Sequence, residues 1–170
     1  RIADCAGVGG SGSLCLSGMA GSDDNFLDLA GRTLLFDGPL EGTLSREDAR
    51  SELVGNAWDQ AVILRSGADL DGDGWNDLLV GAIHAELVAG AVALVSDPPA
   101  GEQNLWSVAF ATLVGTQPPG ELGMGLAMAD VDGDGHTDVF AGAPIEGPGS
   151  AHLFLGPFAG ERSDVEADVT

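Results

Sequence analysis

The chain repeats itself, and this repeat restricts the folds that it can adopt. Residues 68–82 match residues 129–143. Residues 31–39, 90–98 and 149–157 also match one another, and their starting points are evenly spaced. Tandem units of this length are typical of arrays in which each unit buries its apolar face against its neighbours. We therefore expect one unit over residues 1–170, with repeats at about 1–58, 59–119 and 120–170.

Each repeat consists of short apolar segments separated by Gly, Pro and Asp, which is typical of strands and turns. We expect an all-β fold of three four-stranded antiparallel units, the first opening on a shortened strand and the last closing with a fourth strand. Residues 44–53 also fit a helix, with Ser45 and Asp48 placed as a capping box, but the alignment favours a strand. The expected strands are residues 61–65, 77–80, 91–95 and 110–114 in the second repeat, and 126–129, 138–141, 151–155 and 165–169 in the third.

The charge of the chain favours cations as partners. Its 170 residues carry 27 acids against 6 bases, a formal net charge of −21, and all the bases are Arg. Nucleic acid and anionic membrane surfaces are poor partners, because binding them requires basic side chains that replace counterions. The longest mostly apolar stretch, residues 82–95, is too short to cross a bilayer, so we expect no membrane insertion.

Two acidic loops, residues 69–77 and 130–138, follow the pattern Asp-x-Asp-Gly-Asp-Gly-x-x-Asp. Calcium takes six to eight oxygen ligands, and acids at loop positions one, three, five and nine can converge on one ion. Position seven would add its backbone carbonyl. We therefore predict two Ca²⁺ sites with these ligands: Asp69, Asp71, Asp73, Trp75 through its backbone oxygen and Asp77 in the first; Asp130, Asp132, Asp134, His136 through its backbone oxygen and Asp138 in the second.

Three other interpretations of these loops are weaker. Plain acidic turns would not explain two copies of the same long pattern at matched positions. A helix–loop–helix hand needs a Glu at position twelve, where the chain has Val80 and Ala141. Magnesium prefers fewer protein ligands in a smaller octahedral cage.

The first repeat has lost the acids at the middle of its loop. Asp4 and the two glycines remain, whereas Ala6 and Val8 replace the middle acids, so we expect no ion there. Cys5 and Cys15 flank this loop instead. We expect a disulfide between them, which would close the loop in an oxidising compartment.

Several remaining residues have two interpretations. The acidic insertion of Asp23, Asp24, Asn25 and Asp28 fits a solvated loop better than a further cation site. The tryptophans, Trp58, Trp75 and Trp106, fit packing better than sugar stacking. The histidines, His84, His136 and His152, have no metal-ligand spacing and are expected to be structural or exposed. We find no catalytic dyad, and we expect no enzyme.

The two acidic loops and the residues after them resemble the FG-GAP repeat of integrin α-subunit propellers. In the third repeat, residues 122–127 resemble the Phe-Gly element with Leu122 in place of Phe, whereas residues 59–62 depart from that element. The resemblance implies propeller-type blades with calcium in a blade loop, in an extracellular or cell-surface protein. Closed propellers of the family have about seven blades, and this chain has three repeats, so an incomplete propeller is expected.

These observations leave two hypotheses for the function. In the first, the chain is a secreted, calcium-binding structural or adhesive protein that assembles through exposed strand edges into homo-oligomeric rings or filaments. In the second, it is a lectin-like or receptor-like fragment of a larger integrin-like propeller, which binds an extracellular protein or a glycan. Oligomeric state and ligand binding distinguish the two.

Overall fold

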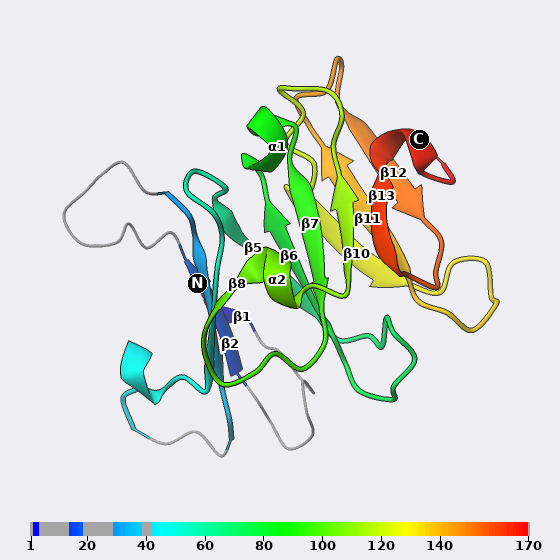
Figure 1. Cartoon of the computed structure of the whole chain (residues 1–170). Helices are drawn as coiled ribbons and strands as arrows, with labels where there is room; N and C mark the ends of the chain where they lie inside the picture. The colour runs from blue at the N-terminus through cyan, green and yellow to red at the C-terminus, as the bar shows by residue number, and fades with distance from the viewer. Residues whose placement is uncertain (1, 4–13, 19–28, 39–41, 170) are drawn as a thin grey trace.

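The computed structural model describes residues 2–3, 14–18, 29–38 and 42–169, with side chains described from residue 29 onward. Its regular structure is strand with a few short helical turns, so the all-β prediction is confirmed. The strands form three open sheets that lie next to one another, and no closed barrel is present in the described residues (Figure 1). No helix in this part of the chain combines the length and apolar character that a bilayer crossing needs.

The first sheet contains the four strands of the first repeat. They are β1 (Ile2–Ala3), β2 (Leu14–Gly18), β3 (Arg32–Phe36) and β4 (Ser51–Val54), each antiparallel to the next. The shortened first strand is present as expected, and Ala3 pairs with Cys15. Cys5, the expected disulfide partner of Cys15, lies outside the described residues, so the disulfide stays a prediction.

The second sheet contains the four strands expected for the second repeat. They are β5 (Ala61–Ser66), β6 (Leu78–Ala82), β7 (Ala91–Val95) and β9 (Ala111–Val114), and β6 and β7 are joined by the turn α1 (Ala85–Val88). Every residue of β6 and β7 is buried. Alternation of apolar and polar residues is lost there because the sheet is covered on both faces.

The third sheet has three strands, β10 (Gly125–Ala129), β11 (Asp138–Ala143) and β12 (Ser150–Phe154). The prediction of a fourth strand at residues 165–169 was wrong. This segment begins in a 3-10 turn, η2 (Asp164–Glu166), and returns to the sheet only at a single bridge between Val169 and Leu153. Side-chain hydrogen bonds hold the turn, since the Glu166 carboxylate accepts the backbone N–H of Ser163 at 2.8 Å.

Two further strands make the first and second sheets larger than the four strands that the repeat predicted. β8 (Gly101–Asn104) lies parallel to β4, and β13 (Gly160–Ser163) lies parallel to β9. Each extends the sheet of the preceding repeat, so the first and second sheets have five strands. These segments are short and polar, and therefore lack the apolar alternation by which a strand is recognised. Backbone hydrogen bonds thus join each sheet to the repeat that follows it.

A helical turn occurs at the same place in every repeat. The turns are η1 (Arg46–Asp48), α2 (Leu105–Val108) and η2, and their first residues are evenly spaced along the chain. The two interpretations of residues 44–53 were therefore each right in part, because η1 is followed directly by β4. In η1 the Asp48 carboxylate accepts the Ser45 backbone N–H at 2.8 Å, the back-bond of a capping box.

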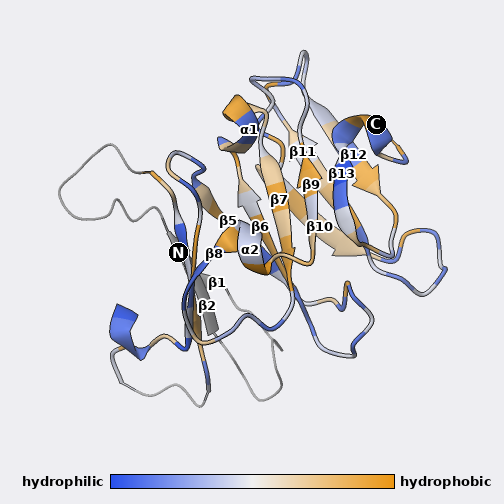
Figure 2. Cartoon of the chain, in the orientation of Figure 1, coloured by the Kyte–Doolittle hydropathy of each residue, from blue (hydrophilic) through white to orange (hydrophobic). Residues whose placement is uncertain are grey.

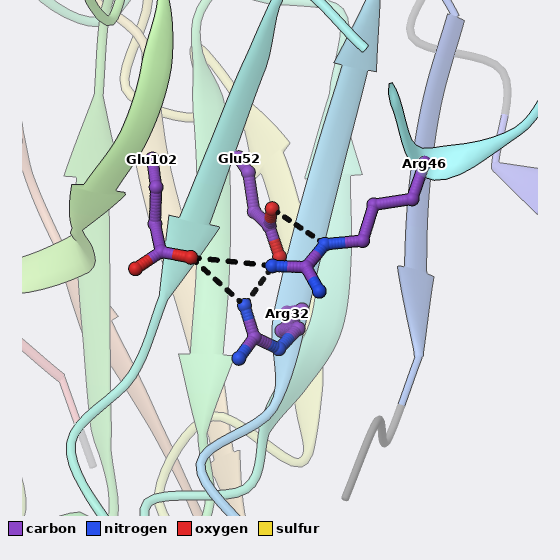
Figure 3. Close-up of polar contacts among 4 residues, drawn as sticks. All are labelled: Arg32, Arg46, Glu52 and Glu102. Atoms are coloured by element: carbon purple, nitrogen blue, oxygen red, sulfur yellow. Dashed lines mark hydrogen bonds and ion pairs between the residues drawn. The ribbon is translucent and has the colours of Figure 1, made fainter. Parts of the chain in front are cut away.

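An ion-pair network reinforces the junction between the first two repeats (Figure 3). Glu52 of β4 pairs with Arg32 of β3 and with Arg46 of η1, the latter at 2.8 Å. Glu102 of β8 lies 3.2 Å from Arg46. Glu52 is almost buried, whereas Glu102 is exposed. The network therefore ties the parallel strand β8 to three elements of the first repeat.

The core consists of two apolar layers, one on each face of the second sheet. Figure 2 shows that hydrophobic residues gather along the strands of this sheet. One layer packs that sheet against the first, with Leu35 and Leu53 facing Val80. The other packs it against the third, with Leu79 among its residues. The outer face of the third sheet has no such cover among the described residues: Phe140, the equivalent of Leu79, is 41% exposed, whereas Leu79 is 0% exposed.

Candidate metal centres

The two acidic loops occupy the same place in successive repeats. Residues 69–77 connect β5 to β6, and residues 130–138 connect β10 to β11. Each loop therefore lies at the end of a sheet, where it joins the first two strands of its repeat (Figure 1). The buried side chain of Leu70 anchors the first loop in the apolar layer between the second and third sheets. The position of each loop is thus fixed by the strands and by the core.

The acid at position one organises the turn of each loop. The Asp69 carboxylate accepts the N–H groups of Gly72 and Gly74 at 2.7 and 2.8 Å. Asp130 accepts those of Gly133 and Gly135 at 2.7 and 3.0 Å. The four glycines all have positive φ, between 80° and 92°. Glycine is required because this left-handed backbone is unfavourable for residues with a Cβ.

The acids at positions three and five each accept a hydrogen bond from the backbone N–H two residues further along the loop. Asp71 Oδ1 accepts the Asp73 N–H at 3.0 Å, and Asp73 Oδ1 accepts the Trp75 N–H at 2.8 Å. The same bonds recur in the second loop, at 3.1 Å to Asp132 and 2.8 Å to Asp134. The two loops therefore share their internal hydrogen bonds as well as their sequence.

The acid at position nine is buried in both loops. Asp77 Oδ2 accepts the Leu70 N–H at 2.7 Å, and Asp138 Oδ2 accepts the Val131 N–H at 2.8 Å. The other oxygen differs. Asp138 Oδ1 accepts the Gly156 N–H at 2.9 Å, a contact that sequence analysis missed because it comes from a distant turn. Asp77 Oδ1 is buried and has no hydrogen-bond partner in the described part of the chain.

Three carboxylates converge in each loop. One oxygen each from Asp69, Asp71 and Asp77 lies within 4.8 Å of the others, and Asp130, Asp132 and Asp138 form the same group in the second loop. The acids at position five, Asp73 and Asp134, are not in these groups. The side chains of Trp75 and His136, whose carbonyls were predicted as ligands, are exposed. This all-oxygen donor set fits a hard cation such as Ca²⁺, and in the first loop it includes a buried Asp77 oxygen without a hydrogen bond in the described part of the chain.

Burial raises the pKa of Asp77 from 3.8 to about 6, against the opposing effects of the hydrogen bond from Leu70 and of the nearby Ser96 side chain. The neighbouring charge of Asp71 contributes in the same direction as burial. A cation at the loop would favour the ionised form of Asp77 and reverse both effects.

The ion pairs in the described part of the chain engage acids outside the two loops. Arg50 pairs with Asp37 and Asp97, and Arg162 pairs with Asp168. The pairs of Arg32 and Arg46 involve Glu52 and Glu102. These arginines therefore pair with acids that lie outside the two loops.

The other candidate residues are placed as follows. Trp106 packs against the first apolar layer, and its Nε1–H donates to Asp59 Oδ2 at 2.6 Å, a packing role. Trp58 is about half exposed. The ring of His84 contacts the Gln60 side chain at 2.5 Å. His152 is buried, and the acidic insertion with Asp23, Asp24, Asn25 and Asp28 lies outside the described residues.

Comparisons with known proteins point to one family. Residues 122–154 match the family model of the FG-GAP repeat. Human integrin alpha-7 is 31% identical over 127 residues, which cover 68% of this chain and 10% of the integrin. Integrin alpha-PS2 of Drosophila melanogaster is 28% identical over 173 residues, covering 81% and 12%. Human integrin alpha-IIb is 38% identical over 107 residues, covering 56% and 10%. The chain thus spans about a tenth of the length of these relatives.

Proposed function

The chain belongs to the FG-GAP repeat family, and from this premise we propose that its two acidic loops bind calcium. The observation that carries the proposal is the convergence of three carboxylates in each loop. Like charges held this close repel one another, and a divalent cation removes that repulsion. Magnesium remains the competitor, and it fits less well because it prefers fewer protein ligands in a smaller octahedral cage.

The ion has a structural role in this proposal. Each loop joins two adjacent strands, and its acids already bind the loop's own amides. A cation between the carboxylates would fix the end of the sheet. Extracellular modules bind calcium with a Kd of roughly 10⁻⁴–10⁻³ M, so the sites would be filled outside cells and empty in a resting cytosol.

Thermal melting in calcium and in chelator tests this role. At a calcium concentration about ten times the Kd, each site adds roughly 1.4 kcal/mol, and two sites raise the Tm by about 5–10 °C. Replacing Asp71 and Asp132 together by Asn should remove the shift, whereas Asp97→Asn, outside the loops, should keep it. An equal Tm in calcium and chelator for the unaltered protein would refute the structural role.

We further propose that the chain forms part of an integrin-like propeller at the cell surface or outside the cell, with a role in adhesion or in binding an extracellular protein or glycan. The matched part of this chain spans only about a tenth of each relative, which favours this hypothesis over an independent self-assembling protein. The open face around Phe140 would then be covered by another FG-GAP repeat, as the equivalent Leu79 is covered here.

Size-exclusion chromatography with light scattering distinguishes the two hypotheses. A fragment of a larger propeller is expected to be monomeric at low concentration, and Phe140→Ser should leave its mass unchanged. Rings or filaments that form in calcium and are lost in Phe140→Ser would instead support self-assembly through the open face.

A further inference from the structure

The third repeat buries a group of ionisable side chains where the second repeat is apolar. His152 of β12 and Asp164 of η2 are both buried, and Glu146, in the turn between β11 and β12, lies beside them. A ring nitrogen of His152 and one oxygen from each acid lie within 4.8 Å of one another. Sequence analysis missed this group because the spacing of its members matches no recognised ligand motif.

The second repeat shows which side chains occupy the equivalent positions. His152 and Asp164 align with apolar residues of the second repeat, Ala93 and Leu105 respectively. These two are 0% exposed and belong to one apolar layer. The architecture of a repeat therefore does not require polar groups at these positions. Burying them costs free energy unless they are paired, so the third repeat carries a cost that the second avoids.

Neighbouring residues hold all three side chains in place, since the Ser150 hydroxyl also lies 2.9 Å from His152 Nε2. Asp164 accepts the Thr116 N–H at 2.8 Å and the Thr116 hydroxyl at 2.7 Å. Glu146 Oε2 accepts the Ser150 hydroxyl at 2.5 Å and lies 2.9 Å from His152 Nε2. Hydrogen bonds of this kind orient the ligands of metal centres.

One atom of the group is left without a partner. His152 Nδ1 is buried and has no hydrogen bond within the described residues. The His152 side chain is only 3% exposed, so bulk water does not satisfy this nitrogen. Nε2 is the ring nitrogen that faces Glu146, so an ion held by both residues would bind at Nε2 and the proton of the ring would lie on Nδ1. A buried imidazole grouped with two carboxylates favours a cation.

We propose that Glu146, His152 and Asp164 form a site for a single transition-metal ion of the zinc type. Imidazole nitrogen with carboxylate oxygen is a donor set that zinc accepts, and calcium takes oxygen ligands only. Zn–ligand bonds of about 2.0–2.2 Å at tetrahedral angles place ligand atoms roughly 3.4 Å apart, so an ion would draw together any pair of atoms near the 4.8 Å limit of the group. Three protein ligands leave one position for water.

The site is separate from the acidic loops. Residues 130–138 lie before β11, whereas Glu146 lies after it, so the two sites are at opposite ends of that strand. The Glu146 side chain is 23% exposed, which gives an ion a way in from solvent. Zinc binding here is therefore independent of calcium in the loops.

Calorimetric titration of zinc into the calcium-saturated protein tests the proposal, because calcium occupies the acidic loops in advance. One equivalent of zinc should bind. His152→Ala, which introduces the residue present in the second repeat, should weaken binding more than about 100-fold. Ser150→Ala, which removes a hydroxyl that contacts both Glu146 and His152, should weaken it about tenfold. His84→Ala is the matched control and should leave the Kd unchanged.

Two further measurements make the result decisive. Imidazole nitrogen NMR should show zinc shifting the signals of His152 and leaving those of His84 in place. Glu146→Gln changes a partly exposed side chain, and should lower the affinity at least tenfold while circular dichroism stays the same. The proposal is overturned if the unaltered protein binds no zinc, or if His152→Ala and Glu146→Gln bind it as tightly as the unaltered protein.

Discussion

At the scale of single residues, the Asp77 carboxylate fastens the loop with one oxygen and buries the other, and burying this charge is unfavourable without a cation. One carboxylate oxygen fastens the loop by accepting the amides of Leu70 and Asp71. The other is buried without a partner in the described part of the chain, and the pKa of the group is raised to about 6 as a result of burial. The carboxylate is therefore positioned by the fold and left available to a ligand.

Calcium affinity at the second-repeat loop should fall as the pH falls through 6. Calcium must displace the proton from Asp77, whose pKa is about 6 in the cation-free protein, so affinity at pH 5 should be about tenfold lower than at pH 7. Calcium titrations of an Asp132→Asn variant, which retains only this loop, measure the effect. An affinity that is the same at both pH values would contradict the account.

The cation-free fold should respond to pH in the opposite direction. Since the folded-state pKa of Asp77 exceeds its ordinary value of 3.8, the stability that this group contributes is present below 3.8 and lost as the pH rises through about 6. Unfolding in chelator at several pH values measures it. In Asp77→Asn this component of the pH dependence should be absent.

Gly90 is required by close contact between successive repeats. Its φ is +86°, and a Cβ there would lie 2.2 Å from the backbone nitrogen of Leu122, with which Gly90 forms a bridge. Gly90→Ala should therefore lower the free energy of unfolding by more than about 2 kcal/mol. The matched control is Gly101→Ala, where φ is +89° but the space is open, at a cost of only about 1 kcal/mol. Equal costs in chemical denaturation would show that the contact is unimportant.

At the scale of elements, the repeat predicted what recurs and missed what joins one repeat to the next. The strands of the second repeat and both acidic loops follow from apolar segments and Asp–Gly spacing, which are local signals. β8 and β13 gave no such signal, because their pairing depends on an edge supplied by the preceding repeat. The expected strand at residues 165–169 failed for a related reason, since side-chain bonds hold a turn there.

The candidate metal centres show the same difference between local signals, which the sequence reveals, and long-range contacts, which it does not. The spacing of the acids predicted where the loops lie, but not that Gly156 contacts Asp138 or that Asp77 keeps an unpartnered oxygen among the described residues. Those details depend on burial and on distant turns. His152 and Asp164 were not recognised for the same reason, because only the packing of the second and third sheets brings them together.

The junction at β8 makes a prediction for the ion-pair network. Glu52 is nearly buried between Arg32 and Arg46 (Figure 3), so Glu52→Gln leaves Arg32 only its longer, 3.4 Å pair with the exposed Glu102 and should cost about 3 kcal/mol. Glu102→Gln removes an exposed partner and should cost less than about 1 kcal/mol. Urea unfolding of both variants measures the difference, and similar costs would place the stability of the junction elsewhere.

At the scale of the whole molecule, one sheet is covered on both sides and another is not. The second sheet is enclosed by two apolar layers, while the third leaves the Phe140 face open among the described residues. The net charge of −21 adds repulsion throughout the chain, and divalent cations at the loops would reduce it. Calcium is therefore expected to stabilise the assembly of sheets as well as each loop.

The chain is expected to hold two calcium ions, one in each complete loop. Isothermal titration calorimetry of the chelator-treated protein counts them directly. We predict two equivalents of calcium for the unaltered protein, one for Asp71→Asn and one for Asp132→Asn. A stoichiometry that stays unchanged in both variants, or the absence of calcium binding at millimolar concentration, would contradict the account.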